Sequence, residues 1–323
     1  MPPSAAERIV IRTDGGRRVG LGHVRRCLAL ADALRRRRVH CHFVLHGDDD
    51  AATLVADAGY TVEDGPTADA AARIAARAVV LDSYELAPDE VAAIEPNVRV
   101  VAIDDLGKPD RRADVVTNSG VSASASDYES VDATLLLGPS YALLRAEFAD
   151  EPARAAGTPP RVLVTVGGAD PHDLTPLFVR CALAEVDDAV VDVVAGPFFE
   201  RRPSAGERIA VHDRPTELRA LMLGADIALS AAGHTLFELA ATATPTVAVG
   251  IAENQRPNLS GFAARGTLLA AGEARDPDLE RDVRALLRRL AADRSLREEL
   301  GARGRALVDG QGADRVAEAI LAG

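Results

Sequence analysis

Short runs of β-branched residues alternate with stretches rich in Ala, Leu and Arg along the whole chain, and this alternation constrains the fold more than any other feature. The runs are almost continuously apolar, as expected for parallel strands whose two faces are both covered by helices. The alternation therefore predicts an α/β protein built from doubly wound, Rossmann-like sheets.

The alternation occurs in two series, separated by residues 151–160, which contain three prolines and one glycine and have little tendency toward regular structure. We therefore expect two domains, an N-terminal one over residues 1–150 and a C-terminal one over residues 160–323. Residues 293–323 have a helical pattern and can pack back on the N-terminal domain. Ligands of such sheets bind at the carboxyl ends of the strands, and in a two-domain protein these ends can face each other across a cleft.

The expected elements follow from the apolar runs and from helical periodicity. In the first series we expect strands at residues 8–12, 40–45, 78–81, 98–103 and 115–117, with helices at 23–38, 51–58, 68–76 and 88–94. In the second series we expect strands at residues 161–166, 190–195, 208–211, 227–229, 246–249 and 267–270, with helices at 174–185, 215–223, 236–241, 254–264 and 278–292.

Charge and cysteine content exclude several classes of partner. The 37 basic and 49 acidic residues give a formal net charge of -12, which argues against a nucleic acid or an anionic membrane as partner. No apolar run approaches the roughly 18 residues that span a bilayer, and the first residues show no signal-peptide pattern. The three cysteines are far apart, so we expect buried thiols in a cytoplasmic protein.

Residues 9–31 contain the richest candidate site, an apolar strand followed by a glycine-rich turn and a helix. Gly20 and Gly22 allow the backbone to pass close to a ligand, and the N–H groups of the first helical turn suit an anion. His23 follows directly, where the helix dipole favours the neutral, proton-accepting imidazole. The sequence of this one loop therefore predicts both an anionic ligand and a base.

Two other strand ends of the first series carry polar residues. Asp82, Ser83 and Tyr84 follow one apolar strand, and Asp104 and Asp105 follow the next. Asp104 and Asp105 are as well explained by turn or helix capping as by orienting His23 or a sugar hydroxyl. The sequence leaves these alternatives open.

The second series repeats the pattern of a strand, a glycine turn and a helix. Gly167 and Gly168 form one such turn, and residues 230–235 form another, in which Ser230 and Thr235 could contact a diphosphate. Glu238, one helical turn further, is placed to accept hydrogen bonds from ribose hydroxyls. A fourth strand ends at Asn254 and Gln255, whose amides suit a sugar or a phosphate. Together these loops predict a site for an anionic small molecule.

Three other clusters have simpler interpretations. His40, His42 and His46 lie near one another, but no carboxylate or cysteine at ligand spacing completes a metal site, so we expect none. Residues 48–50 are three aspartates that suit a helix N-terminus, and residues 35–38 are four arginines that suit the solvated end of a helix.

A set of motifs, in this order along nearly the whole chain, resembles the UDP-2,4-diacetamido-2,4,6-trideoxy-β-L-altropyranose hydrolases of pseudaminic acid biosynthesis. The second half is also similar to the N-acetylglucosaminyl transferase that makes lipid II. One departure is Asp14-Gly15-Gly16, where the family pattern has other small residues after the aspartate. The matching segments are Arg12-Thr-Asp14, Gly20-Leu-Gly22-His23-Val-Arg25-Arg26-Cys27, Asp82-Ser-Tyr84, Ile103-Asp-Asp-Leu106, residues 137–148, Gly167-Gly-Ala-Asp170, Ser230-Ala-Ala-Gly-His-Thr235 and Asn254-Gln255.

The resemblance implies the GT-B fold, with two Rossmann-like domains facing across a cleft, and a UDP-linked deoxy-amino sugar as substrate with water as co-substrate. UDP would bind to the C-terminal domain, and His23 would activate the water that attacks the anomeric carbon, with inversion and with no cofactor or metal. The implied catalytic residues are His23, Tyr84 and Asn254. The implied substrate-binding residues are Asp14, Gly20, Gly22, Arg26, Gly167, Gly168, Ser230, Ala232, Gly233, His234, Thr235, Glu238 and Gln255.

Other functions fit the sequence less well. An inverting GT-B glycosyltransferase with a nucleotide-sugar donor is the main alternative, and a binding protein without activity is another. A nicotinamide oxidoreductase is disfavoured because Arg25 stands where the dinucleotide fingerprint has its third glycine, and because the second strand ends at Leu45 and not at an acidic residue. The motifs do not specify the sugar, the acceptor or the pathway.

Overall fold

A computed structural model describes residues 7–17, 19–107, 112–154 and 158–322. The chain forms two compact units. The first unit contains Met1–Ala146 together with Gly310–Gly323, and the second unit contains Glu147–Asp309. Residues 1–6, on which the expectation of no signal peptide partly rests, and residues 155–157 of the expected linker lie outside the described residues. Within the described ranges, no helix is long and apolar enough to cross a membrane.

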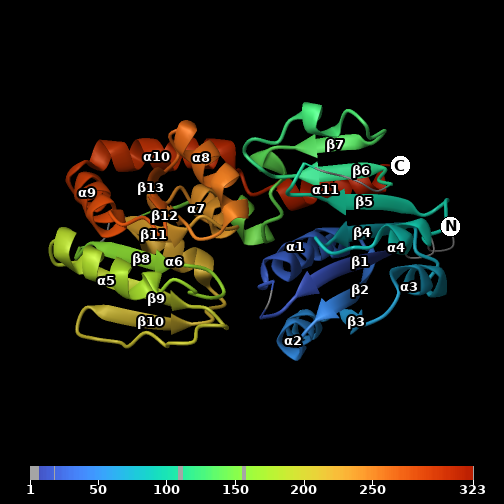
Figure 1. The fold of residues 1–323 in the computed structure, drawn as a ribbon, viewed down its shortest axis with the longest axis horizontal. Helices are drawn as coiled ribbons and strands as arrows, with labels where there is room; N and C mark the ends of the chain where they lie inside the picture. The colour runs from blue at the N-terminus through green and yellow to red at the C-terminus, as the bar shows by residue number, and fades with distance from the viewer. Residues whose placement is uncertain (1–6, 18, 108–111, 155–157, 323) are drawn as a thin grey trace. The chain divides into compact units, whose positions relative to one another are not determined.

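The first unit is built on a seven-stranded sheet with the strand order β3-β2-β1-β4-β5-β6-β7 (Figure 1). The strands pair in parallel, and the chain direction across the sheet reverses between β1 and β4, so a topological switch point lies there. The strands are β1 (Arg8–Gly15), β2 (His40–Gly47), β3 (Thr61–Glu63), β4 (Ala78–Asp82), β5 (Arg99–Ile103), β6 (Val115–Asn118) and β7 (Thr134–Leu137).

Helices cover the sheet of the first unit because its strands are apolar on both faces. Val10, Val44, Val79 and Leu81 are fully buried and belong to one cluster with side chains of α3 and α4. The helix α2 begins at its aspartate run, where Asp48 accepts a hydrogen bond from the N–H of Ala51, as predicted. The helices are α1 (Gly22–Arg36), α2 (Asp49–Asp57), α3 (Thr67–Arg73), α4 (Pro88–Ala92) and α11 (Gly312–Leu321).

The C-terminal helix α11 packs against α1 within the first unit. Arg36 of α1 lies 2.9 Å from the carboxylate of Asp314, and Arg37 lies 2.8 Å from that of Glu318. The arginine run forms the end of α1 as predicted, and Arg36 and Arg37 in addition form ion pairs. They form ion pairs because α11 brings its carboxylates to the negative pole of α1.

The second unit contains a six-stranded parallel sheet with the order β10-β9-β8-β11-β12-β13, so its switch point lies between β8 and β11. Its strands are β8 (Arg161–Thr165), β9 (Val190–Ala195), β10 (Ile209–Asp213), β11 (Ile227–Ala231), β12 (Thr246–Gly250) and β13 (Leu269–Glu273). Its helices are α5 (Leu174–Glu185), α6 (Leu218–Gly224), α7 (Thr235–Ala241), α8 (Arg256–Ala264), α9 (Leu279–Ala292) and α10 (Arg294–Leu307).

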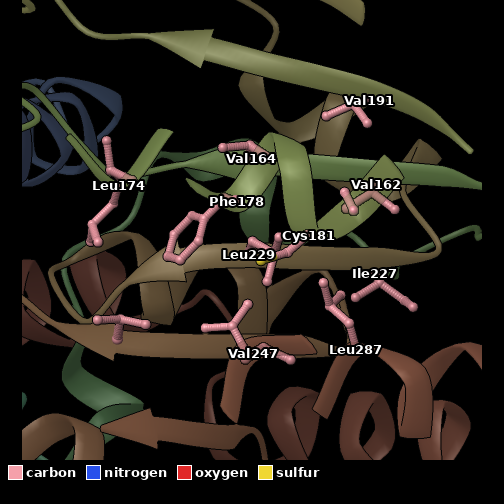
Figure 2. Packing of buried hydrophobic residues seen from close by; sticks show 14 of the residues in the cluster. Val162, Val164, Leu174, Phe178, Cys181, Val191, Ile227, Leu229, Val247 and Leu287 are labelled. Carbon is pink, nitrogen blue, oxygen red and sulfur yellow. The ribbon is translucent and has the colours of Figure 1, made fainter. Parts of the chain in front are cut away.

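The core of the second unit lies where α5 and α9 pack on its sheet. Figure 2 shows Phe178 and Cys181 of α5 and Leu287 of α9 among strand residues such as Val164 and Leu229. All five are at most 1% exposed. Complete burial of one such large apolar side chain stabilises a fold by about 1.5–3 kcal/mol, so this layer is sufficient to hold the helices on the sheet.

The structure confirms the predicted fold class of two doubly wound α/β sheets. Two short strands, β3 and β7, were not expected. Both lie at a sheet edge, where a strand needs only one partner and where the apolar pattern is weak. A third difference is local: residues 253–255 form a 3₁₀ turn, and α8 begins only at Arg256, which Pro257 follows in the first helical turn.

Candidate active site

Three side chains on one face of α1 converge on the end of β4. His23, Arg26 and Cys27 are spaced three and four residues apart, so the helix presents them side by side. All three contact Asp82, the last residue of β4, which is completely buried. Because α1 follows β1, and β1 pairs with β4, this cluster lies at the switch point of the first unit, where doubly wound sheets bind ligands.

Asp82 is held as a carboxylate by its neighbours. Its Oδ1 lies 2.6 Å from His23 Nδ1, and its Oδ2 accepts a hydrogen bond of 2.7 Å from Arg26 Nε. Burial by itself would raise the pKa of Asp82, but the Arg26 guanidinium and His23 outweigh it and hold that pKa well below its usual range. Asp82 is therefore an acceptor only.

This acceptor fixes the protonation pattern of His23. A carboxylate 2.6 Å from Nδ1 requires the proton to lie on Nδ1, because Asp82 has none to donate. In the neutral ring the lone pair is then on Nε2, the nitrogen that can accept a proton from a ligand. The contact of 3.3 Å between Arg26 Nη2 and Nδ1 is not a hydrogen bond in this tautomer, since both atoms are donors.

Tyr84 stands beside His23, but its hydroxyl is directed elsewhere. The two rings meet edge to face with centroids 4.7 Å apart. The Tyr84 hydroxyl donates a hydrogen bond of 2.7 Å to Asp105 Oδ2, and burial together with the Asp105 charge raises the pKa of Tyr84. Tyr84 thus packs on the imidazole, and its hydroxyl is engaged by a carboxylate; the predicted catalytic role of Tyr84 stays a prediction.

The two aspartates after β5 have separate roles, and neither contacts His23 in the recorded hydrogen bonds. Asp104 accepts from the Leu106 N–H at 2.8 Å and from the Tyr128 hydroxyl at 2.9 Å, so the capping interpretation is confirmed for it. Asp105 accepts two hydrogen bonds of 2.8 Å from Arg26 Nη1. The carboxylate that contacts His23 Nδ1 is that of Asp82, and contact of Asp104 or Asp105 with a sugar hydroxyl stays a prediction.

Arg26, an implied substrate-binding residue, forms ion pairs within this cluster in the structure, and its contact with substrate stays a prediction. Its side chain is 10% exposed and links the carboxylates of Asp82 and Asp105. Desolvation would lower the pKa of Arg26, but these two carboxylates raise it well above the usual value. All of its recorded partners in the described chain are side chains of this cluster, so it organises the site from within.

The glycine loop before α1 has the geometry expected of a close approach to a ligand. Gly20 has φ of +81°, a conformation that favours glycine. Gly16 and Gly20 exchange two backbone hydrogen bonds of 3.0 and 2.7 Å, and no side chain caps the N-terminus of α1, which begins at Gly22. Asp14 does not reach this loop as a free carboxylate, because it accepts a hydrogen bond of 2.7 Å from Arg12.

In the second unit, the turn after β8 is already occupied in part by the protein itself. Gly167 has φ of +97°, which suits glycine. Asp170 accepts hydrogen bonds of 2.8 Å from the N–H groups of both Leu174 and Thr175. The N-terminus of α5, expected to attract an anionic ligand, therefore holds this carboxylate, and any anion at the turn would have to contact the Gly167 and Gly168 backbone.

The turn after β11 presents fewer groups than expected. Ser230 is completely buried, and its hydroxyl donates a hydrogen bond of 2.9 Å to the carbonyl of Ala231. The Ala232 N–H donates 2.9 Å to the Val249 carbonyl, which extends the pairing with β12. The Ser230 hydroxyl is thus engaged by the neighbouring carbonyl and the Ala232 N–H by the strand ladder, so these two donors are not free for the expected diphosphate contacts. The partly exposed members of this turn are Gly233, His234, Thr235 and Glu238.

The turn after β12 is joined to its neighbours at the same edge of the sheet. Gln255 Oε1 accepts from the Ile251 N–H at 3.2 Å, and its Nε2 lies so near Gly233 that a Cβ there would be 3.5 Å away. His172, after β8, lies with Nε2 3.1 Å from the Ile251 carbonyl. Sequence reasoning gave His172 no role; its position just after a glycine turn was the available signal.

Asn254 is exposed beside Gln255, and it belongs to the second unit, whereas His23 and Tyr84 belong to the first. The structure thus assembles the predicted residues into two groups, one at the switch point of each sheet. That Asn254 acts together with His23 stays a prediction.

No family model matches the chain. It is 25% identical over 331 residues to the spore coat polysaccharide biosynthesis protein SpsG of Bacillus subtilis, covering 95% of each chain. It is 26% identical over 179 residues to the UDP-2,4-diacetamido-2,4,6-trideoxy-beta-L-altropyranose hydrolase of Campylobacter jejuni, covering 52% of this chain and 63% of the other. An uncharacterized protein of Methanocaldococcus jannaschii is 26% identical, and the match covers 77% of this chain but only 57% of that protein.

Solved structures of glycosyltransferases share the fold at low sequence identity. The glycotransferase of kitacinnamycin superposes with a TM-score of 0.69 at 17% identity, covering 98% of this chain and 99% of the other. MurG of Acinetobacter baumannii gives a TM-score of 0.67 at 14% identity, covering 98% and 100%. Anabaena HepE, solved in complex with UDP-glucose, gives 0.63 at 10% identity, covering 98% and 99%. These likenesses establish the GT-B fold.

Proposed function

We propose that this chain is an enzyme that hydrolyses a nucleotide-linked sugar, with His23 as the general base. The observation that carries the proposal is the 2.6 Å contact between His23 Nδ1 and the buried carboxylate of Asp82 at the switch point of the first sheet. A carboxylate that fixes the imidazole tautomer and stabilises the imidazolium is the arrangement that makes histidine an effective base.

In the proposed step, His23 Nε2 takes a proton from a water molecule as the water oxygen attacks the anomeric carbon of the sugar. The bond between that carbon and the phosphate oxygen breaks, and its electron pair leaves with the nucleoside diphosphate. Attack from the side opposite the leaving group inverts the anomeric centre. Asp82 does not take the proton; it stabilises the positive charge that forms on the ring.

Three supports bear on the substrate. The relatives of Campylobacter jejuni and Helicobacter pylori carry a UDP-deoxy-amino-sugar hydrolase in their names, at 26% and 23% identity. Solved neighbours of the same fold were crystallised with UDP-glucose and thymidine diphosphate. The joined loops after β8, β11 and β12 lie at the ligand-binding edge of the second sheet. We therefore propose UDP as the nucleotide, held by the second unit, and a deoxy-amino sugar as the group released.

A second candidate is an inverting glycosyltransferase, favoured by the likeness to glycosyltransferase structures over almost the whole chain. The same base would then deprotonate an alcohol instead of water. The two reactions differ in one requirement: a hydrolase releases the nucleotide without an acceptor.

The test is UDP release from a panel of UDP-sugars without acceptor, comparing the wild type with His23→Ala and with His40→Ala, an exposed histidine on β2, as the matched control. We expect release by the wild type and the control, and a loss of roughly 10²–10⁴-fold in His23→Ala with UDP binding retained. UDP binding without release would overturn hydrolysis in favour of transfer. Release that survives in His23→Ala would overturn the assigned base.

A further inference from the structure

A cavity lies in the second unit, away from the loops described above. Its volume is about 530 Å³, within the range of small-molecule sites. It is lined by the first residues of β8 and β11, including Val162 and Ile227, and therefore lies at the amino edge of the sheet. Figure 2 shows these two side chains toward one end of the sheet and Leu174, which follows the Gly167–Gly168 turn, toward the other.

The walls of this cavity are basic, in a chain whose net charge is -12. Four arginines line it, against two carboxylates. Two of the arginines are already neutralised: Arg161 pairs with Asp192, and Arg294 pairs with Glu298. The proposed ligand site depends on the other two arginines, Arg154 and Arg297.

The recorded partners of Arg154 and Arg297 in the described chain are neutral. Arg154 donates to the carbonyl of Met222 at 3.0 Å, to the hydroxyl of Thr244 at 2.8 Å, and to two further carbonyls. Arg297 donates to the carbonyls of Leu290 and Ala291. Burial lowers the pKa of Arg154 to about 10, and the nearby charge of Asp226 only partly opposes this. Asp226 also lines the cavity but forms no ion pair with Arg154 among the described residues, so this cation is partly desolvated and only partly balanced.

The chemistry of the walls defines a ligand. A guanidinium group offers a planar fork of N–H donors that matches a phosphate or a carboxylate. Val162, Ile227 and Pro245 supply an apolar floor beside the arginines. We propose that this cavity is a second binding site, for a small organic anion that places its phosphate or carboxylate against Arg154 and Arg297 and its apolar part on this floor.

The position of the cavity distinguishes it from the nucleotide-sugar site. The chain passes from the first unit to the second at Glu147 and returns at Gly310. Arg154 follows the first passage, and Arg297 lies on α10, the last helix before the second. Arg305 of α10 also donates a hydrogen bond of 2.9 Å to the carbonyl of Phe148, so α10 contacts the segment that enters the second unit. A bound anion would therefore contact the segment that enters the second unit and the helix that precedes the return to the first.

The proposal is tested by isothermal titration calorimetry of the full chain with phenyl phosphate, which carries an anion on an apolar ring. Benzoate replaces the phosphate by a carboxylate, phenol has no anion, and inorganic phosphate has no apolar part. The variants are Arg297→Gln, which removes one guanidinium, and Ala302→Phe, which fills the cavity from an exposed position on α10 and removes no charge. Arg281→Gln on the exposed surface of α9 is the matched control.

We expect phenyl phosphate or benzoate to bind the wild type and the control alike, about tenfold or more weakly in Arg297→Gln, and not at all in Ala302→Phe. Thermal unfolding verifies that each variant is folded. Both arginines also cap helix C-termini, and a purely structural role predicts lower stability with no anion binding. Absence of binding to the wild type, equal binding of phenol, equal binding of inorganic phosphate, or binding unchanged in both variants overturns the proposal.

Discussion

His23 Nδ1 and Asp82 Oδ1 lie 2.6 Å apart although 59 residues separate them in the chain. The contact joins the first turn of α1 to the last residue of β4, two elements that meet because β1 and β4 are neighbours at the switch point of the sheet. It gives the imidazole one defined tautomer, and the proposed chemistry depends on that tautomer.

Asp82→Asn should remove this control. An asparagine amide can donate to Nδ1 and stabilise the wrong tautomer, and it cannot stabilise the imidazolium. We expect kcat for nucleotide release to fall by roughly 10²–10⁴-fold with little change in UDP affinity. Asp89→Asn, an exposed carboxylate in the first turn of α4, is the control. A variant that keeps wild-type kcat would show that Asp82 does not act through His23.

The same carboxylate predicts how stability changes in acid. The folded pKa of Asp82 is depressed below its unfolded value of about 3.9. Between the folded and the unfolded pKa the unfolded chain binds more protons, so stability rises with pH. The contribution of Asp82 to stability is fully present above the unfolded pKa and is lost as pH falls toward the folded pKa. Between pH 5 and pH 3, the unfolding free energy of the wild type should fall by about 1 kcal/mol more than that of Asp82→Asn. Urea unfolding at both pH values measures this, and parallel losses would contradict it.

Asp105 should influence His23 through Arg26 without touching it. Without the Asp105 charge, Asp82 is the carboxylate that remains paired with Arg26. Asp82 then stabilises the positive charge on the His23 imidazolium less. We expect Asp105→Asn to move the acid limb of the kcat profile to lower pH by about 0.2–0.7 unit, the scale of a partly exposed ion pair. Tyr84→Phe removes the hydroxyl that donates to Asp105 but keeps every charge, so its profile should not move. Equal shifts in both variants would point to packing as the cause.

Asp170 is predicted to stabilise the second unit as a helix cap. Its carboxylate accepts from two N–H groups at the start of α5. Asp170→Ala should lower the unfolding free energy by about 0.5–2 kcal/mol. Asp173→Asn removes an exposed carboxylate that pairs with exposed Arg201, and asparagine tolerates the φ of +53° at this position, so this variant should cost less. Equal losses in denaturant titrations would show that the capping bonds contribute nothing.

The three cysteines should be inert in the native protein. Cys27, Cys41 and Cys181 are free and buried. Burial raises the pKa of Cys41 to about 12 and that of Cys181 to about 11, so little thiolate is present at neutral pH. Ellman's reagent should react slowly with the folded chain and should reach three thiols per chain after unfolding in guanidinium. Rapid reaction of one thiol in native buffer would contradict this burial.

Much of the fold could be predicted from the sequence because its signals are local. The bounds expected for α5 and β9 are those observed, since each is a long, regular run with clear ends. The edge strands β3 and β7 were not predicted, because three or four residues with one neighbouring strand show little hydrophobic periodicity. The glycine turn and His23 could be predicted for the same reason, because the turn, the helix start and the histidine are contiguous in the chain.

Local sequence patterns are sufficient to predict two doubly wound sheets and a histidine, His23, at the start of a helix after a glycine loop. The residues that surround this histidine depend on the tertiary structure. Strand order brought Asp82 to it and left Asp104 to cap a turn, and the converging helix face of α1 turned Arg26 inward. In the second unit the pairing of β11 with β12 engages the Ala232 N–H, and the Ala231 carbonyl accepts a hydrogen bond from the Ser230 hydroxyl. Local patterns specify elements, whereas partners distant in the chain are set by which strands become neighbours.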